Sequence, residues 1–305
     1  MSLDVVIIGG SFAGLSTALY LGRAQRSVRI IDSAKPRNRF SHHAHGIFGH
    51  DGSDPADILA KARTQVLAYP TNRVVNGAAV RIERAARGFT TTLASGEVLE
   101  SARVVLAYGI TDELPAIPGV AERWGQSVLH CPYCHGYEYR GNRLGVLYLS
   151  PMSLHQAMLI KEWGPTTLLL NGHQPSAEEE APLRALVEGG VEIERSVVRS
   201  LHGENTDLSA AELEDGRLVQ LDALYIGPRN HPNTDLAEQL GCDHEEGPLG
   251  IRILVSPEQE TTVRGVYAAG DITRFGHNAT AATADGVMAA MSSQRSFVFA
   301  QSSTR

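Results

Sequence analysis

Short apolar runs alternate with a helical segment at the start of the chain. Val5 to Ile8 and Val28 to Ile31 are continuous apolar runs, typical of parallel strands that are buried on both faces. The segment between them, Ala13 to Ala24, is rich in good helix formers. This order predicts a strand, a helix and a second strand, which is the repeating unit of a parallel sheet.

Polar residues dominate the stretch that follows. Residues 33–55 are rich in His, Arg, Asn, Gly and Pro and predict a long functional loop, followed by a helix over Asp57–Leu67. Residues 72–107 contain short apolar segments separated by turn residues such as Asn76-Gly77, and they predict a small antiparallel sheet. Val104 to Ala107 predicts one further buried strand.

The strand–helix–strand pattern returns in the middle of the chain. The strands expected there are Leu144–Leu149, Thr167–Leu170, Val191–Val198, Ala211–Leu213 and Ala223–Ile226, with a helix over Ser153–Trp163. Later, a strand ends in Gly270-Asp271, and Ala279–Met291 predicts a helix of small residues. The simplest arrangement is one α/β domain inserted into another. We therefore expect a first domain made of residues 1–114 and 232–305, and an inserted domain of residues 115–231.

Composition and charge narrow the class of protein. The chain has 305 residues, enough for two domains, and 43% hydrophobic with 20% charged residues predicts a packed core. The net charge is −7 and there is no long basic run, which argues against a nucleic-acid partner. No apolar run approaches the roughly 18 residues of a membrane span, and we expect no signal peptide before the first strand. We expect a cytoplasmic protein without a membrane partner.

The first turn fits a dinucleotide. Gly9, Ser11 and Gly14 occupy the three positions of Gly-x-Gly-x-x-Gly, with serine where a glycine usually lets the pyrophosphate approach. The helix that follows offers free N–H groups to the pyrophosphate. Asp32 follows Gly9 at about the 20-residue spacing of an acid that binds the ribose 2′-hydroxyl. Because this acid repels a 2′-phosphate, FAD or NAD is favoured over NADP.

The place for a second nucleotide lacks glycine. The turn after Leu144–Leu149 reads Leu149-Ser150-Pro151-Met152. Pro151 removes a backbone donor at a turn that should present donors, and the other side chains block close approach. This turn argues against a nicotinamide site.

A thiol pair lies between the two units. Cys131 and Cys134 form Cys-x-x-Cys, which indicates redox chemistry or metal binding, whereas Cys242 is alone and is expected to be a small buried residue. Half of a zinc site and a structural disulfide are the alternatives. Zinc is disfavoured because there is no second Cys-x-x-Cys and because His130 and His135 directly adjoin the cysteines, so we predict no metal.

Four segments together resemble the low-molecular-weight thioredoxin reductase superfamily over essentially the whole chain: IIGGSFAGL, LAYGITDELPAIPG, CPYCHGYEYRG and VYAAGDIT. The cysteine segment is most similar to the FAD-dependent dithiol oxidases that close disulfides in gliotoxin, holomycin and romidepsin. The resemblance implies a two-domain α/β flavoprotein and a role in antibiotic biosynthesis. It also implies a discontinuous Rossmann-like FAD-binding domain, an inserted smaller α/β domain with the cysteine pair, and a homodimer.

Two departures from thioredoxin reductases are informative. Those enzymes use a glycine-rich second turn and an arginine cluster to bind NADPH, whereas this chain has Asn171-Gly172-His173 at the matching position. Reductases also carry Arg-Gln after the Gly-Asp motif, where this chain has His277-Asn278. We therefore expect no productive NADPH binding and a histidine near the flavin.

The resemblance also implies roles for individual residues. Cys134 would face the flavin, Cys131 would face the substrate, and His277 would be the general base, with a surface histidine as the alternative reading. Gly46 stands where many relatives have asparagine. The implied FAD contacts are Gly9, Ser11, Phe12, Ala13, Gly14, Asp32, Lys35, Arg39, His45, Val80, Ala107, Gly109, Gly270, Asp271, Asn278 and Ala279.

The expected activity is oxidation of a small-molecule dithiol to an intramolecular disulfide, with oxygen as acceptor and hydrogen peroxide as product. The oxygen step follows only from the missing nicotinamide site. A thioredoxin-type disulfide reductase fed by ferredoxin or another donor is the alternative. A flavin-holding sensor without turnover is a third hypothesis, against which the presence of both cysteines beside a histidine argues.

Overall fold

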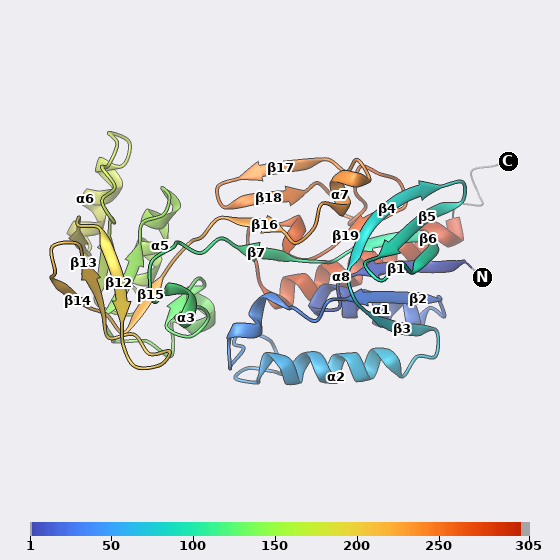
Figure 1. Cartoon of the computed structure of the whole chain (residues 1–305), viewed down its shortest axis with the longest axis horizontal. Coiled ribbons are helices and arrows are strands. Elements are labelled where there is room, and N and C mark those ends of the chain that lie inside the picture. Colours follow the sequence, from blue (N-terminus) through green and yellow to red (C-terminus); the bar gives the residue numbers. More distant parts are fainter. Residues whose placement is uncertain (1, 300–305) are drawn as a thin grey trace.

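The computed structural model describes residues 2–299, and they form two parts joined by two strands (Figure 1). In Figure 1 the blue N-terminal and red C-terminal segments share the larger part, whereas green and yellow segments form the smaller one. The chain therefore leaves the larger part and returns to it. We propose the division into residues 1–114 and 232–305 against 115–231, of which residues 1 and 300–305 lie outside the described residues.

A seven-stranded sheet forms the centre of the larger part. Its strands are β1 (Leu3–Ile8), β2 (Val28–Asp32), β3 (Asn72–Asn76), β4 (Ala79–Ala85), β5 (Gly88–Leu93), β6 (Val98–Leu106) and β19 (Val266–Ala268). They lie in the order β3-β2-β1-β6-β5-β4, and β19 pairs with β6. The strands β3, β2, β1, β6 and β19 run parallel, so their carboxyl ends meet at one edge.

The expectation of a small antiparallel sheet over residues 72–107 is confirmed for β4, β5 and the first part of β6, but these strands belong to the seven-stranded sheet. β3 pairs in parallel with β2, and β6 takes part in two kinds of pairing. The first residues of β6 pair antiparallel with β5, and its last residues pair parallel with β1 and β19. Because β6 is nine residues long, β4 and β5 become an extension of the parallel sheet.

Helices cover this sheet. They are α1 (Phe12–Arg23), α2 (Pro55–Leu67), α7 (Leu236–Gln239) and α8 (Ala279–Phe299), with single 3₁₀ turns η1 (Arg37–Phe40) and η2 (Asp271–Thr273). The predicted loop 33–55 thus contains η1. α1 crosses α8 closely: Thr17 Oγ1 donates to the carbonyls of Ala13 and Gly286, each at 2.9 Å. α8 continues past its predicted end at Met291, because Ser292 and Ser293 are buried like the alanines before them.

The smaller part contains a five-stranded and a three-stranded sheet. The first has the order β11-β10-β9-β15-β8, and the second β12-β13-β14. Their bounds are β8 (Val128–Leu129), β9 (Leu144–Leu147), β10 (Thr166–Leu169), β11 (Glu192–Glu194), β12 (Val198–His202), β13 (Ala210–Leu213), β14 (Leu218–Gln220) and β15 (Ala223–Tyr225). The helices are α3 (Val120–Arg123), α4 (Pro132–His135), α5 (Met152–Ile160) and α6 (Glu180–Glu188).

The single strand expected over Val191–Val198 is instead two strands in different sheets, β11 and β12. The Glu194 carboxylate accepts hydrogen bonds from the backbone N–H groups of Arg195 (2.7 Å) and Ser196 (2.9 Å), which turns the chain between them. The helix expected to reach Trp163 ends at Ile160.

Two short strands connect the parts. β7 (Ile110–Asp112) and β16 (Asn230–Pro232) pair antiparallel, and they extend into a four-stranded sheet with β17 (His244–Gly247) and β18 (Gly250–Ile253). The central strands β1 and β9 are buried on both faces, as their continuous apolar runs predicted. In β1, Val5 and Ile7 enter one core cluster and Val6 and Ile8 the other.

Candidate active site

Close packing explains the glycines of the first turn. Gly9 has φ +112°, and a Cβ there would overlap the carbonyl oxygen of Ala107 at the end of β6. A Cβ on Gly14 would overlap the carbonyl oxygen of Gly9, so α1 and β1 could not approach as they do. The turn is therefore built for backbone to lie directly beside a bound group.

The N-terminus of α1 is open to an anion. Within the described residues, the side chain of the N-cap residue Ser11 makes no capping hydrogen bond, and the first turn carries no acid. The free N–H groups and the positive end of the helix dipole favour a phosphate there. At the end of β2, the Asp32 carboxylate is held by Arg63 (3.0 Å) and by the N–H of Ala34 (3.0 Å). A helix end for the pyrophosphate and an acid for the ribose fit FAD.

Further predicted residues gather at the same edge of the sheet. Ala107 and Gly109 follow β6, and Gly270 and Asp271 follow β19, its parallel neighbour. A Cβ on Gly270 would lie 3.1 Å from the Cβ of Ala13, beside Phe12 in the first turn of α1. Residues after parallel strands thus meet where nucleotides bind in such sheets.

The remaining predicted contacts lie in different surroundings. Asn278 Oδ1 accepts from the N–H of Ala281 (2.7 Å), so it caps α8, which begins at Ala279. Lys35 and Arg39 are exposed on the loop before and within η1. Val80 is half exposed on β4, which β6 and β5 separate from β1 in the sheet. The roles of these residues, like those of the other predicted FAD contacts, stay predictions.

The cysteine pair forms a disulfide at the start of a short helix. Cys131 is the N-cap of α4, and Cys134 lies within that helix, with the two Cα atoms 5.3 Å apart. Pro132 occupies the first helical position, where its missing N–H costs little. Tyr133 is exposed and lies edge-on to Trp163, with ring centroids 5.8 Å apart.

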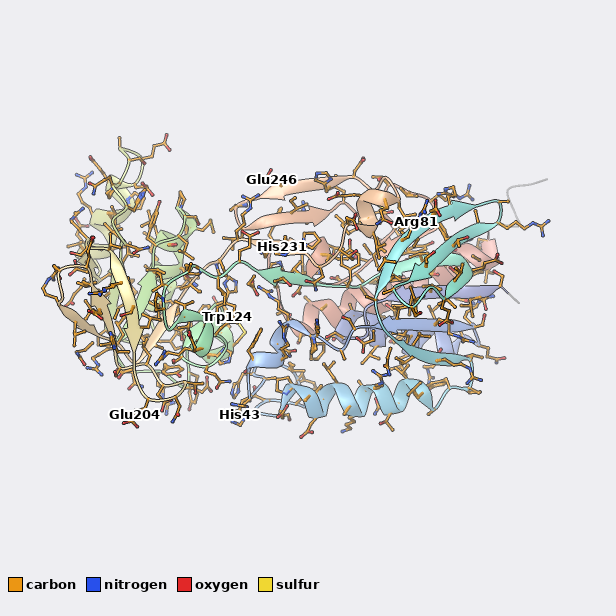
Figure 2. The ribbon with its side chains drawn as sticks, in the orientation of Figure 1. His43, Arg81, Trp124, Glu204, His231 and Glu246 are labelled. Carbon is orange, nitrogen blue, oxygen red and sulfur yellow. A yellow bond between two sulfur atoms is a disulfide. The ribbon has the colours of Figure 1, made fainter. Side chains whose placement is uncertain are left out.

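The cysteine helix lies against the loop of the larger part. Ser41 Oγ is 3.3 Å from His135 Nε2, and His45 Nε2 is 3.5 Å from Glu138 Oε1. The side-chain amide of Gln126 also donates to the carbonyl of Phe40. Figure 2 shows the same junction through labelled residues of the loop and of the smaller part, His43 and Trp124. These contacts bring the predicted His45 and the disulfide to one junction.

Histidines at this junction are disfavoured in their charged form. Burial, and then the charge of Arg37, lower the pKa of His277 to about 4. Burial and Arg37 also lower the pKa of His130, although its hydrogen bond to the Ile226 carbonyl opposes them. Burial lowers the pKa of His135. Near neutral pH these rings are uncharged and able to accept protons.

Sequence reasoning missed two residues of the junction, Arg37 and Asp112. They form a bidentate ion pair, and Arg37 also contacts Asp271. An arginine in a polar loop has no periodicity or motif that would mark it, and its partners lie far away in the sequence. Only the pairing of three distant segments reveals it.

The turn of the second nucleotide unit is closed by its own side chains. Ser153 Oγ accepts from the N–H groups of Leu149 (3.0 Å) and Ser150 (3.4 Å), and Ser153 itself is buried. Pro151, next in the turn, has no N–H to offer. The amides that would face a pyrophosphate at this place therefore face a serine.

The ends of β9 and β10 are also filled. The rings of Tyr148 and His173 stack with centroids 3.9 Å apart. Both bind the buried carboxylate of Glu179, which accepts from Tyr148 Oη, from His173 Nε2 (2.9 Å) and from the N–H of Ser176 (2.8 Å). These hydrogen bonds lower the pKa of Glu179 to about 2. A stacked ring pair and a permanent negative charge do not suit a nucleotide phosphate.

Residues 2–299 contain no group of three or more His, Cys, Asp or Glu side chains that could hold a metal ion. Over the same residues, no helix has both the length and the apolar character needed to cross a bilayer.

Comparisons with known proteins extend over nearly the whole chain. The family model described as pyridine nucleotide-disulphide oxidoreductase matches residues 3–286. Thioredoxin reductase tcpT of Claviceps purpurea is 34% identical over 281 residues, which cover 88% of this chain and 86% of that protein. The crystal structure of an oxidoreductase from Agrobacterium tumefaciens is 42% identical, with a TM-score of 0.91, and covers 98% of this chain and 99% of that one. The crystal structure of HlmI is 34% identical, with a TM-score of 0.92, and covers 99% and 95%.

Proposed function

Because the chain belongs to the pyridine nucleotide-disulphide oxidoreductase family and is a flavin-dependent oxidoreductase that binds FAD, we propose that it oxidises a small-molecule dithiol to an intramolecular disulfide. The predicted resemblance to thioredoxin reductase-like proteins and the two-part α/β fold are confirmed. One observation carries the proposal: a cysteine disulfide lies at the junction, while the second nucleotide turn is closed by Ser153. Electrons then enter at sulfur rather than from a nicotinamide.

The residues proposed to hold FAD are those at the carboxyl edge of the seven-stranded sheet. The α1 N-terminus at Ser11 would bind the pyrophosphate, and Asp32 would bind the ribose. Gly270 and Asp271 would lie beside the flavin half of the cofactor. FAD held there would supply a two-electron acceptor for the reduced cysteine pair, and molecular oxygen would be the proposed final oxidant, with hydrogen peroxide as product.

The cysteines perform the exchange. A substrate thiolate attacks Cys131 Sγ, the Cys131–Cys134 bond breaks, and Cys134 leaves as a thiolate. The second substrate thiolate then attacks the substrate sulfur of the mixed disulfide and displaces Cys131. The substrate has lost two electrons and two protons, and the cysteine pair holds the two electrons as thiolates.

Each attack requires a thiol to lose its proton. We assign His277 as the general base, since its ring is uncharged at neutral pH, although its lowered pKa makes it a weaker base than a free imidazole. The start of α4 favours thiolate at Cys131 by its free N–H groups and helix dipole.

A disulfide reductase fed by ferredoxin or another donor is the second candidate. The name of the relative tcpT, a thioredoxin reductase, favours it. In that case electrons would flow from the flavin to a disulfide, in the reverse direction.

Anaerobic rapid mixing of the holoenzyme tests the proposal. A small dithiol such as dithiothreitol should bleach the flavin absorbance within seconds, and NADPH or NADH should leave it unchanged. Admitting oxygen should restore the absorbance and release one hydrogen peroxide per dithiol oxidised. Bleaching by NADPH would refute the proposal, and bleaching only by reduced ferredoxin would favour the second candidate.

We further propose that the enzyme is a homodimer that acts in the cytoplasm and in antibiotic biosynthesis. Dithiol substrate and oxygen are its proposed partners. Neither nucleic acid nor a membrane is among them.

A further inference from the structure

The sequence of α8 contains one acidic residue, and its side chain is buried. Asp285 is 6% exposed and stands in a segment made of Ala, Thr, Gly, Val and Met residues. A carboxylate taken out of water is costly unless it is paired and hydrogen-bonded. Neither the proposed thiol exchange nor the predicted FAD contacts use Asp285, although it lies next to residues that belong to both.

The partners of this carboxylate come from the segment that follows β19. The Asp285 Oδ2 atom accepts from Arg274 Nε at 2.9 Å and from the backbone N–H of Gly270 at 3.3 Å. Arg274 Nη2 donates to the other oxygen, Oδ1, which completes a bidentate pair. One carboxylate on α8 thus holds both ends of the turn that runs from Gly270 to Arg274.

Helix α8 is itself fixed on α1 at this point. A Cβ on Gly286, the residue after Asp285, would overlap the carbonyl oxygen of Ala13 in the first turn of α1. Thr17 of α1 donates to the carbonyl of Gly286 at 2.9 Å. The Asp285 carboxylate therefore has a fixed place relative to the helix end that would bind the pyrophosphate of FAD.

His277 lies on the short loop between η2 and α8, and this loop is anchored on both sides of it. Before His277, the Arg274 side chain is bound to Asp285. After His277, the Asn278 Oδ1 atom accepts from the N–H of Ala281 at 2.7 Å and caps α8. A hydrogen bond from the ring of His277 to the backbone of Arg274 joins the two residues directly.

We propose that Asp285 and Arg274 are positioning residues for the dithiol oxidation: their ion pair fixes the loop that carries His277, the proposed base, relative to the helix end that would hold FAD. The inference rests on the proposed function. Both residues act through the place that they give to His277 and not on the reacting sulfur atoms. A base transfers protons efficiently only when it is held at the right distance, so a looser loop should slow flavin reduction.

Arg274→Gln tests the pair by removing the guanidinium. The buried carboxylate loses its cation and the loop loses an anchor, so anaerobic flavin reduction by dithiothreitol should slow by about 10- to 100-fold. Arg274→Lys keeps the charge but not the bidentate geometry, and it should slow the reaction by no more than about fivefold.

Arg143→Gln is the matched control. Arg143 forms the same kind of bidentate pair with Asp222, with Nε–Oδ2 at 2.9 Å and Nη2–Oδ1 at 2.6 Å. These two residues directly precede β9 and β15, whereas His130 binds the carbonyl of Ile226 at the other end of β15. The control variant should therefore reduce flavin at the wild-type rate.

A double-mutant cycle with His277 separates positioning of the base from a general loss of stability. If Arg274 acts through His277, Arg274→Gln should slow flavin reduction by less than about twofold in a His277→Asn background. If Arg274 only stabilises the molecule, the two losses should multiply. Rates are expressed per bound FAD, and the midpoint of thermal unfolding is recorded for each variant.

A neutral pair separates the cost of a buried charge from the loss of the anchor. Arg274→Gln combined with Asp285→Asn leaves no unpaired carboxylate, and the Asn oxygen can still accept from the N–H of Gly270. The midpoint of thermal unfolding should return towards the wild-type value in this double variant. The rate should stay low, because the rigid bidentate contact that fixes the loop is still missing.

A second readout does not depend on turnover. The ring signal of His277, assigned with His277→Asn, is titrated by NMR in the oxidised, FAD-loaded protein. Burial is the largest cause of its pKa of about 4; Arg37 and His130 also lower this pKa, and Asp271 raises it. A released loop exposes the ring to water, so in Arg274→Gln the pKa should rise towards the value of about 6.5 of a free imidazole.

Losses that multiply in the cycle, or an unchanged titration of His277 in Arg274→Gln, would overturn the inference. A wild-type rate in His277→Asn would also overturn it, since there would be no base to position. If Arg274→Gln does not retain FAD, Arg274→Lys decides by the same criteria. Wild-type flavin that dithiols fail to bleach would refute the proposed function instead, and the NMR titration would still decide whether the ion pair fixes the loop of His277.

Discussion

Cys134 and Cys242 have opposite surroundings. Cys242 is buried, its Sγ lies 3.5 Å from Thr261 Oγ1, and burial raises the pKa of its thiol. Cys134 is bonded to Cys131 in a short helix at the junction. A thiol reacts as thiolate, so the buried Cys242 is inert, whereas Cys134 is placed for thiol–disulfide exchange.

We predict that Cys134→Ser abolishes flavin reduction by dithiols while FAD stays bound. Serine cannot form the disulfide that receives the substrate electrons, so reduction should fall below detection in anaerobic absorbance measurements. Cys242→Ser is the matched control and should retain the wild-type rate. Wild-type bleaching in Cys134→Ser would remove Cys134 from the proposed path.

We assign the acid limb of the pH–rate profile, which is the fall in the rate of flavin reduction at low pH, to protonation of His277. A base works only uncharged, and burial and Arg37 hold the pKa of this ring at about 4. The rate of flavin reduction should therefore be insensitive to this group at neutral pH and fall only as the pH drops towards about 4.

His277→Asn should slow flavin reduction by about 100-fold, because a general base typically contributes at least that factor. FAD content should be unchanged, and the acid limb should disappear from the pH profile. His244→Asn, an exposed histidine on β17, serves as the control. A rate within twofold of wild type would leave His277 without a catalytic role.

At the scale of elements, β1, α1 and β2 follow the pattern of the sequence to within a residue or two. Their apolar runs are buried on both faces, and local pattern alone determines them. The pairing of β6 was harder to predict from the sequence, because this single strand changes from antiparallel to parallel partners along its length. Arg37 could not be predicted, because its role comes from Asp112 and Asp271, which only the folded chain brings to it.

The turn between β1 and α1 gives an element-scale prediction. In Gly14→Ala the added Cβ meets the carbonyl oxygen of Gly9, so α1 must move away from β1. We expect a loss of about 1–3 kcal/mol in the free energy of unfolding. We also expect less than half of the wild-type FAD content after desalting. Thermal unfolding and the ratio of flavin to protein absorbance measure both.

Gly227→Ala is the control for this change. Its Cβ would lie 3.7 Å from Gln156 Oε1, an ordinary contact, and it should keep wild-type stability and FAD. Full FAD content in Gly14→Ala would mean that the tight crossing of α1 and β1 is not needed for the cofactor.

At the scale of the whole molecule, the two parts serve different ends of one electron path. The larger part has an open helix end and an acid for FAD, and the smaller part keeps a nucleotide-type sheet whose turn is closed by Ser153. Contacts such as Ser41–His135 hold the disulfide against the larger part. The smaller domain thus serves, in our proposal, to present sulfur rather than a second nucleotide.

The proposed homodimer has a candidate surface on α8. Ala284, Met288, Met291, Arg295 and Val298 are exposed and follow one another at alternating spacings of four and three residues. Met288, Met291 and Val298 are 40%, 44% and 53% exposed. This spacing is that of a seam between two helices, and a twofold axis would place the same stripe from a second copy against it.

We therefore predict that the wild-type chain has twice its chain mass in light scattering after gel filtration, and that Met288→Glu with Met291→Glu halves this mass. Each buried methionine contributes about 1.5–3 kcal/mol, and the substitution instead brings four carboxylates together across the axis. Met152→Glu changes a methionine of similar exposure (39%) on α5 and should remain dimeric. A monomeric wild-type chain would refute the dimer, whereas a dimeric double variant would show that the copies associate through another surface, since a seam of like charges this close could not persist.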